Sequence, residues 1–595
     1  MSAVPKKLIN SPEDVVNESI RGFVAVHQDK IRQLENWPRV IVRADLESYV
    51  ESGRVSLLCG GGSGHEPVFA GYVGAGALTV TVAGSIFASP PAAPIVAALN
   101  AVNGKAGTVV FIFNYTGDRL NFGLAIERAA EIERIAKSGP IRVVVLGEDT
   151  AVESNDRTAG RRGLAGSLMV LKMAGAMAES GKFSVHQIAE RSMLISAQTG
   201  TMGLSLSSCS LPGQGHIFQL GPDEMEVGLG VHGEPGVRRS KLLSANESIH
   251  EMLTHLTRKS KLALPLEPGE EVAVLINNLC SMTQLEMNIV CGEVLQWLIE
   301  KGVRVKRVIA GTLYTSLEMQ GISISLLRLV DSEWLEFLDA RTGCAAWPHN
   351  SCKFEAEFCF PAALTLSQNT HDQEDNRKEG ITEYTVSSET EQRLRDCIVA
   401  ACEVLIENES LLNRLDQTAG DGDCGVTMKM GASALLEAFN SQNLSTRSPH
   451  SLFARMSEIW EENTGGTTGA IYALLLASAA SQVATNLTGK TLLDALRHGA
   501  HAVSKYGQAE PGDRTLVDPL CALVSSLEAA PKADIDAYET AIKAAEQATE
   551  ETAGMKAKAG RASYVAHQHL TLPDAGAKAL VLWLRAVFDT VKSPT

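Results

Sequence analysis

A polar stretch at residues 366–380, LSQNTHDQEDNRKEG, separates two parts of the chain whose hydrophobic patterns differ. Before it, short apolar runs alternate with helical patterns. After it, apolar residues recur at helical spacing, and runs typical of strands almost disappear. Because strands and helices need different periodicities, the two parts must fold into domains of different class. We therefore expect a polar linker over 349–387 between an α/β region and a helical domain.

The first part has the rhythm of βαβ units. Its apolar runs are bounded by Gly, Asn, Pro or Asp, and helical patterns at 91–102 and 123–136 lie between them. This alternation predicts a mostly parallel sheet and then a second α/β unit, so that 9–348 divides into subdomains at about 9–194 and 195–348. The candidate strands are 55–59, 78–83, 109–113 and 143–146 in the first subdomain, and 272–276, 305–309 and 322–327 in the second.

The last part, over 388–592, is predicted to be all-α. Leu394, Cys397, Ile398, Ala401 and Leu405 follow helical spacing. The segment 470–487 is almost wholly apolar and rich in alanine, so we expect it to form a central buried helix.

Charge excludes two classes of partner. The 595 residues include 53 Lys and Arg against 69 Asp and Glu, a net charge of −16. Such a surface repels nucleic-acid phosphates and anionic lipids, so we expect neither nucleic-acid nor membrane binding. There is no apolar run of membrane-spanning length and no signal peptide. The 11 cysteines form no CxxC pair, which favours reduced thiols and a cytoplasmic location.

Two motifs follow strands of the first subdomain. The run GGGSGHEP begins at Gly60, directly after the predicted strand 55–59. Four glycines around a Ser-His pair favour a ligand site over a simple turn. Asp118 ends the motif NYTGD, which follows the strand 109–113. Because ligands of α/β sheets bind at the strands' carboxyl ends, Asp118 and His65 can share one crevice and move protons to and from a hydroxyl group. An equal alternative for Asp118 is capping of the next helix.

His232 lies in the rigid sequence VHGEPG. A lone histidine is usually structural, and here that reading and a functional one are balanced. A neutral imidazole can act as a nucleophile towards a carbonyl group.

The strongest motif is DQTAGDGDCG, which carries Asp416, Asp421 and Asp423 within eight residues. Three carboxylates so close repel one another, and a hard divalent cation removes that repulsion. Mg²⁺ held by few carboxylates keeps positions open for nucleotide phosphates. The alternative is a solvated acidic turn.

Further glycine-rich pieces lie in the helical part. GGTTG at 465–469 opens the apolar segment, where helix N–H groups can hold phosphate. PGDRT at 511–515, GRASY at 560–564 and DAG at 574–576 follow. Each alone is weak, but together they predict a nucleotide pocket built from loops that join helices.

These motifs, in this order, resemble the ATP-dependent dihydroxyacetone kinase family in its single-chain eukaryotic form. The resemblance covers nearly the whole chain, with a DhaK-like part at about 9–348 and a DhaL-like part, implied to be a barrel of helices, at about 388–592. It implies ATP-dependent phosphorylation of dihydroxyacetone (glycerone) and D-glyceraldehyde. It also implies FAD-AMP lyase activity, which forms cyclic FMN at the nucleotide site.

The resemblance implies a role for each motif. His232 would bind the substrate carbonyl as a hemiaminal, His65 would polarise it or relay a proton, and Asp118 would be the base. The implied substrate-binding residues are Gly62, Ser63, Gly64, His65 and Asp118. The implied metal ligands are Asp416, Asp421 and Asp423. The implied nucleotide-binding residues are Cys424, Gly425, Val426, Thr427, Thr467, Thr468, Gly507, Thr515, Leu516, Arg561, Asp574, Ala575 and Gly576.

The implied ligands are a triose, ATP as co-substrate, FAD, and Mg²⁺, with Mn²⁺ or Co²⁺ as alternatives for the cyclase. The family also implies a homodimer whose sites join the DhaK-like part of one chain to the DhaL-like part of the other. Many relatives have Lys where this chain has Phe113, which removes a cationic donor from the substrate site. A catalytically weakened protein that regulates another protein by binding it is the alternative from a different class.

Overall fold

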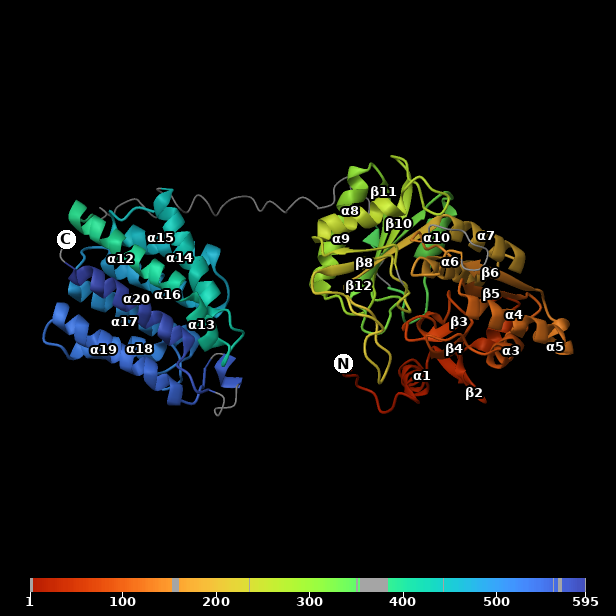
Figure 1. Ribbon diagram of the computed structural model, residues 1–595, viewed down its shortest axis with the longest axis horizontal. Helices are drawn as coiled ribbons and strands as arrows, with labels where there is room; N and C mark the ends of the chain where they lie inside the picture. Colours follow the sequence, from red (N-terminus) through yellow and green to blue (C-terminus); the bar gives the residue numbers. More distant parts are fainter. Residues whose placement is uncertain are drawn as a thin grey trace. The chain divides into compact units, whose positions relative to one another are not determined.

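The computed structural model describes residues 4–151, 160–234, 236–348, 352–353, 384–441, 444–559, 561–564 and 570–593. The chain divides into two compact units, Met1–Leu364 and Thr365–Thr595. We call them the α/β unit and the helical unit (Figure 1). This division in class agrees with the change of hydrophobic pattern.

A six-stranded sheet, in the order β1-β2-β4-β3-β5-β6, forms the first half of the α/β unit. Strands β3 to β6 are parallel to one another, and β1 and β2 form an antiparallel edge. Its strands are β1 (Ile31–Leu34), β2 (Trp37–Arg43), β3 (Ser56–Ser63), β4 (Val80–Ile86), β5 (Thr108–Phe113) and β6 (Ile141–Leu146). Its helices are α1 (Val15–Val26), α2 (Leu46–Glu51), α3 (Ala92–Ala101), α4 (Thr116–Ala130), α5 (Glu133–Ala136), α6 (Ser167–Ser180) and α7 (Val185–Ala197), with the 3₁₀ turn η1 (Ala70–Tyr72).

Strand β5 shows why this sheet needs helices on both faces. Val109, Phe111 and Phe113 belong to the core that contains α6, and Val110 and Ile112 belong to the core that contains α3 and α4. Alternate side chains of a strand point to opposite faces, so a continuous apolar run must be covered twice. The four strands predicted in this subdomain are all present as β3 to β6.

The second sheet is mixed, in the order β13-β11-β10-β12-β7-β8-β9. Only β10 and β11 are parallel among the strand pairs that the structure describes here. Helices α8 and α9 pack with this sheet in one core. The elements are β7 (Thr199–Ser205), β8 (Glu224–Val227), β9 (Arg238–Lys241), α8 (Ala245–Leu256), β10 (Glu271–Asn278), α9 (Gln284–Glu300), β11 (Arg304–Gly311), β12 (Gly321–Arg328), α10 (Glu333–Asp339) and β13 (Cys352–Lys353).

In the described part of the helical unit, eight long helices form a closed ring, drawn from green to blue in Figure 1. Each packs against its neighbour, and α12 closes the ring between α14 and α20. The long helices are α12 (Ser388–Glu407), α14 (Cys424–Asn440), α15 (Pro449–Asn463), α16 (Gly466–Ala480), α17 (Gly489–Gly507), α18 (Val517–Ala529), α19 (Ile535–Glu551) and α20 (Ala575–Lys592). The shorter elements are α13 (Glu409–Asp416), η2 (Ser481–Val483), η3 (Thr552–Gly554) and η4 (Arg561–Tyr564).

The centre of the ring is an apolar cavity of about 490 Å³. The prediction of a central buried helix over 470–487 is therefore wrong. Helix α16 ends at Ala480 and forms one wall of the ring, with Leu475 and Leu476 facing the cavity. Its apolar character reflects contact with two neighbouring helices and with the cavity, and not burial on all sides. Across the described residues, no helix has the length and hydropathy needed to cross a membrane.

Candidate active site

Three rings surround His232 in the α/β unit, and a fourth ring lies behind one of them. His65 lies just beyond β3, and its ring centroid is 4.8 Å from that of His232. The rings of Tyr115 and Phe87 lie 5.0 and 5.2 Å from His232. Tyr314 lies behind His65, with their centroids 5.4 Å apart. We call this group the aromatic cage. It brings together two of the histidines that the sequence singled out.

The ring of His65 is held in one tautomer. Its Nδ1 lies 2.8 Å from the carbonyl oxygen of Thr315, which can only accept, so Nδ1 carries the proton. Nε2 is then an unprotonated acceptor, and it is buried without a hydrogen-bond partner. Burial and the nearby His232 lower the pKa of His65 to about 3, so the ring stays neutral. A substrate hydroxyl group is a suitable donor to this nitrogen.

The imidazole of His232 is about one quarter exposed, at 23% of its side-chain surface, and points its Nδ1 at a carboxylate. The distance from Nδ1 to Oε1 of Glu234 is 2.8 Å. A small molecule can therefore reach the ring. Its Nδ1 is already hydrogen-bonded to Glu234.

Asp118 lies in the first turn of α4, and Tyr115 is the residue that precedes this helix. Because Tyr115 occupies the N-cap position of α4, Asp118 is not the helix cap that the sequence left open. Only 7% of Asp118 is exposed, and Oδ1 is buried without a hydrogen-bond partner. Burial raises the pKa of Asp118 to about 6, although Ser89 and His232 oppose the shift. A buried acceptor with a pKa close to neutral suits a general base.

The glycine-rich run is itself part of β3, which extends to Ser63 and beyond the predicted end at 59. The hydroxyl of Ser63 donates to the carbonyl oxygen of Gly84, and the N–H of Gly64 donates to Glu66. Gly64 has φ +99°, and a Cβ there would lie 2.8 Å from the Phe87 ring. Gly62 would meet the backbone of Ala88 in the same way. Of the predicted substrate-binding residues of this run, only His65 directs a side chain into the aromatic cage.

The acidic motif forms a compact loop between α13 and α14. One ligand oxygen from each of Asp416, Asp421 and Asp423 can be chosen so that all lie within 4.8 Å of one another. Oδ2 of Asp416 accepts the N–H groups of Gly422 and Asp423, at 2.9 and 3.1 Å, which orders the loop. Clustered hard oxygen donors fit Mg²⁺ in their chemistry.

The predicted nucleotide-binding residues gather at one end of the ring. Successive helices of the ring are antiparallel, so α14, α16, α18 and α20 start at the same end and α17 ends there. Cys424, Gly425, Val426 and Thr427 form the first turn of α14. Thr467 and Thr468 are in the first turn of α16, and Gly507 ends α17. Thr515 and Leu516 precede α18, and Ala575 and Gly576 begin α20 after its cap, Asp574. Arg561 begins η4, and its side chain lies outside the description.

Charged side chains from these loops interact with one another. Burial raises the pKa of Asp574 to about 6, and the charges of Arg514, Asp416 and Asp518 also act on it. Arg514 has no exposed side-chain surface and lies 3.8 Å from Asp574. Oxygens of Asp518 accept the N–H groups of Gly512 and Thr515, at 2.5 and 2.7 Å. Together with the free N–H groups of helix N-termini, this arrangement is suited to binding phosphate groups.

Several residues of the site escaped the sequence analysis. Tyr115 and Glu234 belong to motifs that the sequence singled out, so a role for them in the site could have been predicted from the sequence. Phe87, Tyr314 and Thr315 are far from any motif and reach the cage only through the fold. Phe113 is 1% exposed and packs against Phe69 and Tyr314, with centroids 5.2 and 5.9 Å away. It thus supports the cage from behind.

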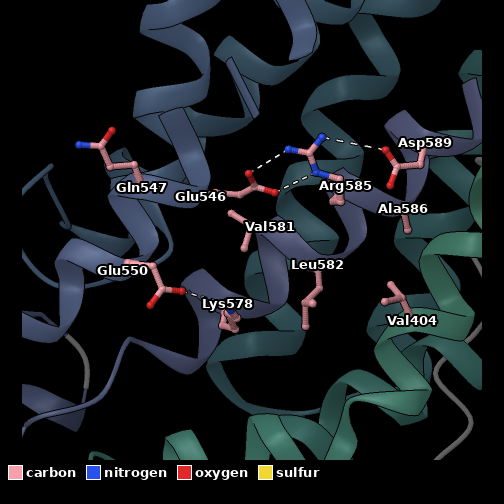
Figure 2. A pocket seen from close by; sticks show the side chains of 10 residues that line it. All are labelled: Val404, Glu546, Gln547, Glu550, Lys578, Val581, Leu582, Arg585, Ala586 and Asp589. Atoms are coloured by element: carbon pink, nitrogen blue, oxygen red, sulfur yellow. Dashed lines mark hydrogen bonds and ion pairs between the residues drawn. The ribbon is translucent and has the colours of Figure 1, made fainter. Parts of the chain in front are cut away.

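A second hollow of about 550 Å³ lies on the helical unit between α12, α19 and α20 (Figure 2). Its charged side chains pair with one another. Arg585 binds Glu546 through two hydrogen bonds of 2.8 Å, and Lys578 binds Glu550 at 2.9 Å. None of the predicted site residues lines it. Because its charges are already paired, this hollow is not part of the candidate site.

Comparison with known proteins agrees with both units. Residues 21–346 match the model of the Dak1 domain, and residues 418–589 match that of the DAK2 domain. The human triokinase/FMN cyclase is 39% identical over 594 residues, which cover 99% of this chain and 100% of that protein. The L-erythrulose kinase of Pectobacterium atrosepticum is 32% identical and is matched over 97% of its length, with 99% of this chain covered.

Among solved structures, the dihydroxyacetone kinase from C. freundii in complex with AMP-PNP and Mg²⁺ is similar along the whole chain. It shares 27% sequence identity with a TM-score of 0.64, and the match covers 98% of this chain and 99% of that one. The expected pair of an α/β region and a helical barrel is thereby confirmed.

Proposed function

Because this chain belongs to the dihydroxyacetone kinase family, with a Dak1 domain followed by a DAK2 domain, we propose that it phosphorylates dihydroxyacetone and D-glyceraldehyde with ATP. The observation that supports this most is the aromatic cage. There an accessible imidazole, a second imidazole with an unpartnered Nε2 and a buried carboxyl group lie together.

The first step captures the carbonyl group. Nε2 of His232 adds to the carbonyl carbon, the carbonyl π electrons move to oxygen, and that oxygen takes a proton from solvent. The product is a hemiaminal on an imidazolium ring. Nε2 of His65 accepts a hydrogen bond from a substrate hydroxyl. Glycerol has no carbonyl group, so it cannot be captured in this way.

The second step transfers the phosphoryl group. Asp118 takes the proton of the terminal hydroxyl group as its oxygen bonds to the γ-phosphorus of ATP, and ADP leaves. Asp416, Asp421 and Asp423 would hold Mg²⁺, which offsets the negative charge of the phosphates when it is bound. The predicted nucleotide-binding residues at the helix N-termini would hold ATP.

An ADP-release assay with dihydroxyacetone, D-glyceraldehyde and glycerol tests this proposal. We expect turnover with both trioses and none above background with glycerol. Equal turnover of glycerol and dihydroxyacetone would contradict carbonyl capture, and no turnover of any of the three would contradict the kinase assignment.

We also propose FAD-AMP lyase activity, with Mg²⁺, Mn²⁺ or Co²⁺, because the human relative named triokinase/FMN cyclase aligns along the full chain. In this reaction a ribityl hydroxyl of FAD attacks its own phosphorus, and AMP leaves as cyclic FMN forms. No carbonyl capture is needed. Chromatographic detection of cyclic FMN from FAD tests the proposal, and its absence with all three metals would reject it.

We propose a homodimer in the cytoplasm, following the family resemblance. Nine cysteines whose side chains the structure describes are free thiols, as a reducing compartment favours. Light scattering after size-exclusion chromatography measures the mass directly, and a mass of one 63.5 kDa chain would rule out the dimer.

A further inference from the structure

One carboxylate holds His232 at two points. Oε1 of Glu234 lies 2.8 Å from Nδ1 of the ring, and Oε2 accepts the backbone N–H of the same histidine at 3.0 Å. An ionised carboxylate only accepts hydrogen bonds, so Nδ1 must carry the proton. The lone pair of the neutral ring is therefore on Nε2, the nitrogen left free to react.

A tight turn places this carboxylate. The N–H of Gly230 donates to the carbonyl oxygen of Glu234 at 2.9 Å, and Gly233 has φ +83°. A Cβ on Gly230 would lie 1.9 Å from Oε2 of Glu234 and 2.4 Å from Nη1 of Arg162. The Glu234 side chain therefore folds back over a position that only glycine allows.

Positive charge keeps Glu234 ionised. Burial alone would raise its pKa, but the hydrogen bond and charge of His232, together with Arg162, lower the pKa to about 2. Arg162 is itself fixed, because it donates to Oδ2 of Asp149 at 2.7 Å and to the carbonyl oxygen of Gly228 at 2.8 Å. The acceptor at Nδ1 is thus a full negative charge at any pH at which the enzyme would work.

We infer that Glu234 is a positioning residue that holds His232 in the reactive tautomer and balances the imidazolium charge of the carbonyl adduct. This inference rests on the proposed function, since it concerns the nitrogen that captures the carbonyl. In this proposal Glu234 acts only through His232, by holding its ring and its backbone N–H.

Glu234→Gln is a discriminating substitution. The amide has one acceptor oxygen, whereas the carboxylate accepts from two N–H groups of His232. If the amide oxygen accepts the backbone N–H, the NH₂ group faces Nδ1 and favours the tautomer in which Nε2 is protonated. If the amide oxygen instead accepts from Nδ1, the NH₂ group faces the backbone N–H of His232, and two donors then point at each other. In either case the negative charge is lost.

The test observes the adduct and the kinetics of the full chain. With [2-¹³C]dihydroxyacetone, ¹³C NMR should show a protein-bound sp³ signal in the wild type that is absent in His232→Ala. In Glu234→Gln this signal should disappear at the same substrate concentration. The kcat/KM for dihydroxyacetone should fall by roughly 10²- to 10⁴-fold, as for other histidines that lose the carboxylate setting their tautomer. The KM for ATP should not change.

Glu226→Gln is the matched control. Glu226 accepts the N–H of Gly236 at the end of the same loop and pairs with Arg239, and in the described part of the chain no hydrogen bond joins it to His232. This variant should keep the adduct signal, and thermal unfolding of both variants shows whether the α/β unit is intact. A wild-type adduct signal in Glu234→Gln, or an equal loss in Glu226→Gln, would overturn the role of Glu234. Absence of the signal in the wild type would instead overturn carbonyl capture by His232, and the inference with it.

Discussion

His65 and His232 show how identical side chains acquire different tasks from their partners. His65 is fully buried and donates to a backbone carbonyl, so it can only accept from the substrate. His232 is partly exposed and donates to a carboxylate, so it can attack. In both rings the acceptor at Nδ1 leaves the lone pair on Nε2, so the tasks differ because His65 is buried against a neutral carbonyl group, whereas His232 is partly exposed and faces a charged carboxylate.

Replacement of His232 by alanine should abolish phosphorylation of dihydroxyacetone at low concentration, because no other side chain of the cage offers an accessible nucleophilic nitrogen. ATP binding should be unchanged, since all predicted nucleotide-binding residues are in the helical unit. A coupled ADP assay and a titration with a fluorescent ATP analogue measure the two properties. Wild-type kcat/KM in this variant would mean that His232 does not bind the substrate.

Asp118 predicts the acid limb of the pH profile. Burial raises its pKa to about 6, and the base must be ionised to accept a proton. The kcat/KM for dihydroxyacetone should therefore fall as pH drops through about 6, by about tenfold for each further unit. A profile that is flat between pH 5 and pH 8, with the protein folded throughout, would exclude Asp118 as the base.

The same shift has a cost for stability. The pKa of Asp118 is higher in the folded state than its ordinary 3.8, so ionisation opposes folding, and stability decreases as pH rises from about 4 to about 6. Asp118→Asn should abolish kinase activity and yet stabilise the α/β unit at pH 7 by about 1–3 kcal/mol. Urea unfolding at pH 7 and at pH 4 measures this, and the gain should be smaller at pH 4.

The residues that sequence identified are those with an unusual local context. The glycines around His65, His232 and the three aspartates marked loops whose backbone path a larger side chain would obstruct. Phe87, Tyr314 and Thr315 carry no such mark. Phe87 follows β4 and meets His65 through pairing of β3 and β4, and Tyr314 and Thr315 meet His65 only after the two sheets have folded together. Phe113, which stands where many relatives have Lys, is 1% exposed and belongs to the core, and the loss of a donor in the substrate site stays a prediction.

At the scale of elements, one aspartate organises a loop of the helical unit. Asp518, in the first turn of α18, accepts two backbone N–H groups of the PGDRT loop, in which Arg514 has φ +63°. A left-handed arginine is unfavourable by itself and needs such support. The loop between α17 and α18 is thus held in place by the helix that follows it.

Asp518→Ala should raise the KM for ATP by roughly tenfold, because two buried donors lose their acceptor and the loop loosens. The KM for dihydroxyacetone should not change. Asp534→Ala is the control, since Asp534 caps α19 through the N–H of Ala537 and is not among the predicted nucleotide-binding residues. If both variants have the same KM for ATP, the loop does not depend on Asp518.

Strands that are apolar on both faces were predictable, because a short unbroken apolar run is typical of a strand that is covered on both faces of its sheet. Those at 109–113 and 272–276 correspond to β5 and β10. Strand β8 and the edge strand β9 were not predicted. Strand β9 consists of Arg238, Arg239, Ser240 and Lys241, so no hydrophobic pattern indicates it, and it pairs with β8.

At the scale of the whole molecule, the two proposed activities should respond differently to mutation. Asp421→Asn removes one carboxylate of the metal loop, so it should depress both triose phosphorylation and cyclic FMN formation. His232→Ala should depress only the phosphorylation, since cyclisation of FAD involves no carbonyl. Parallel assays of both variants with Mg²⁺ and with Mn²⁺ check this. Equal loss of cyclase activity in both, with both variants folded, would contradict the model.

Among the residues that the structure describes, each unit builds its apolar cores from its own side chains: three clusters belong to the α/β unit and four to the helical unit. The chain should therefore not behave as a single cooperative system on heating. Differential scanning calorimetry should resolve two endotherms. Each substrate stabilises the folded state of the unit that binds it and should therefore shift only one endotherm. Dihydroxyacetone should raise the midpoint of one endotherm and ATP with Mg²⁺ that of the other, so that a melting curve reports where each ligand binds without any turnover.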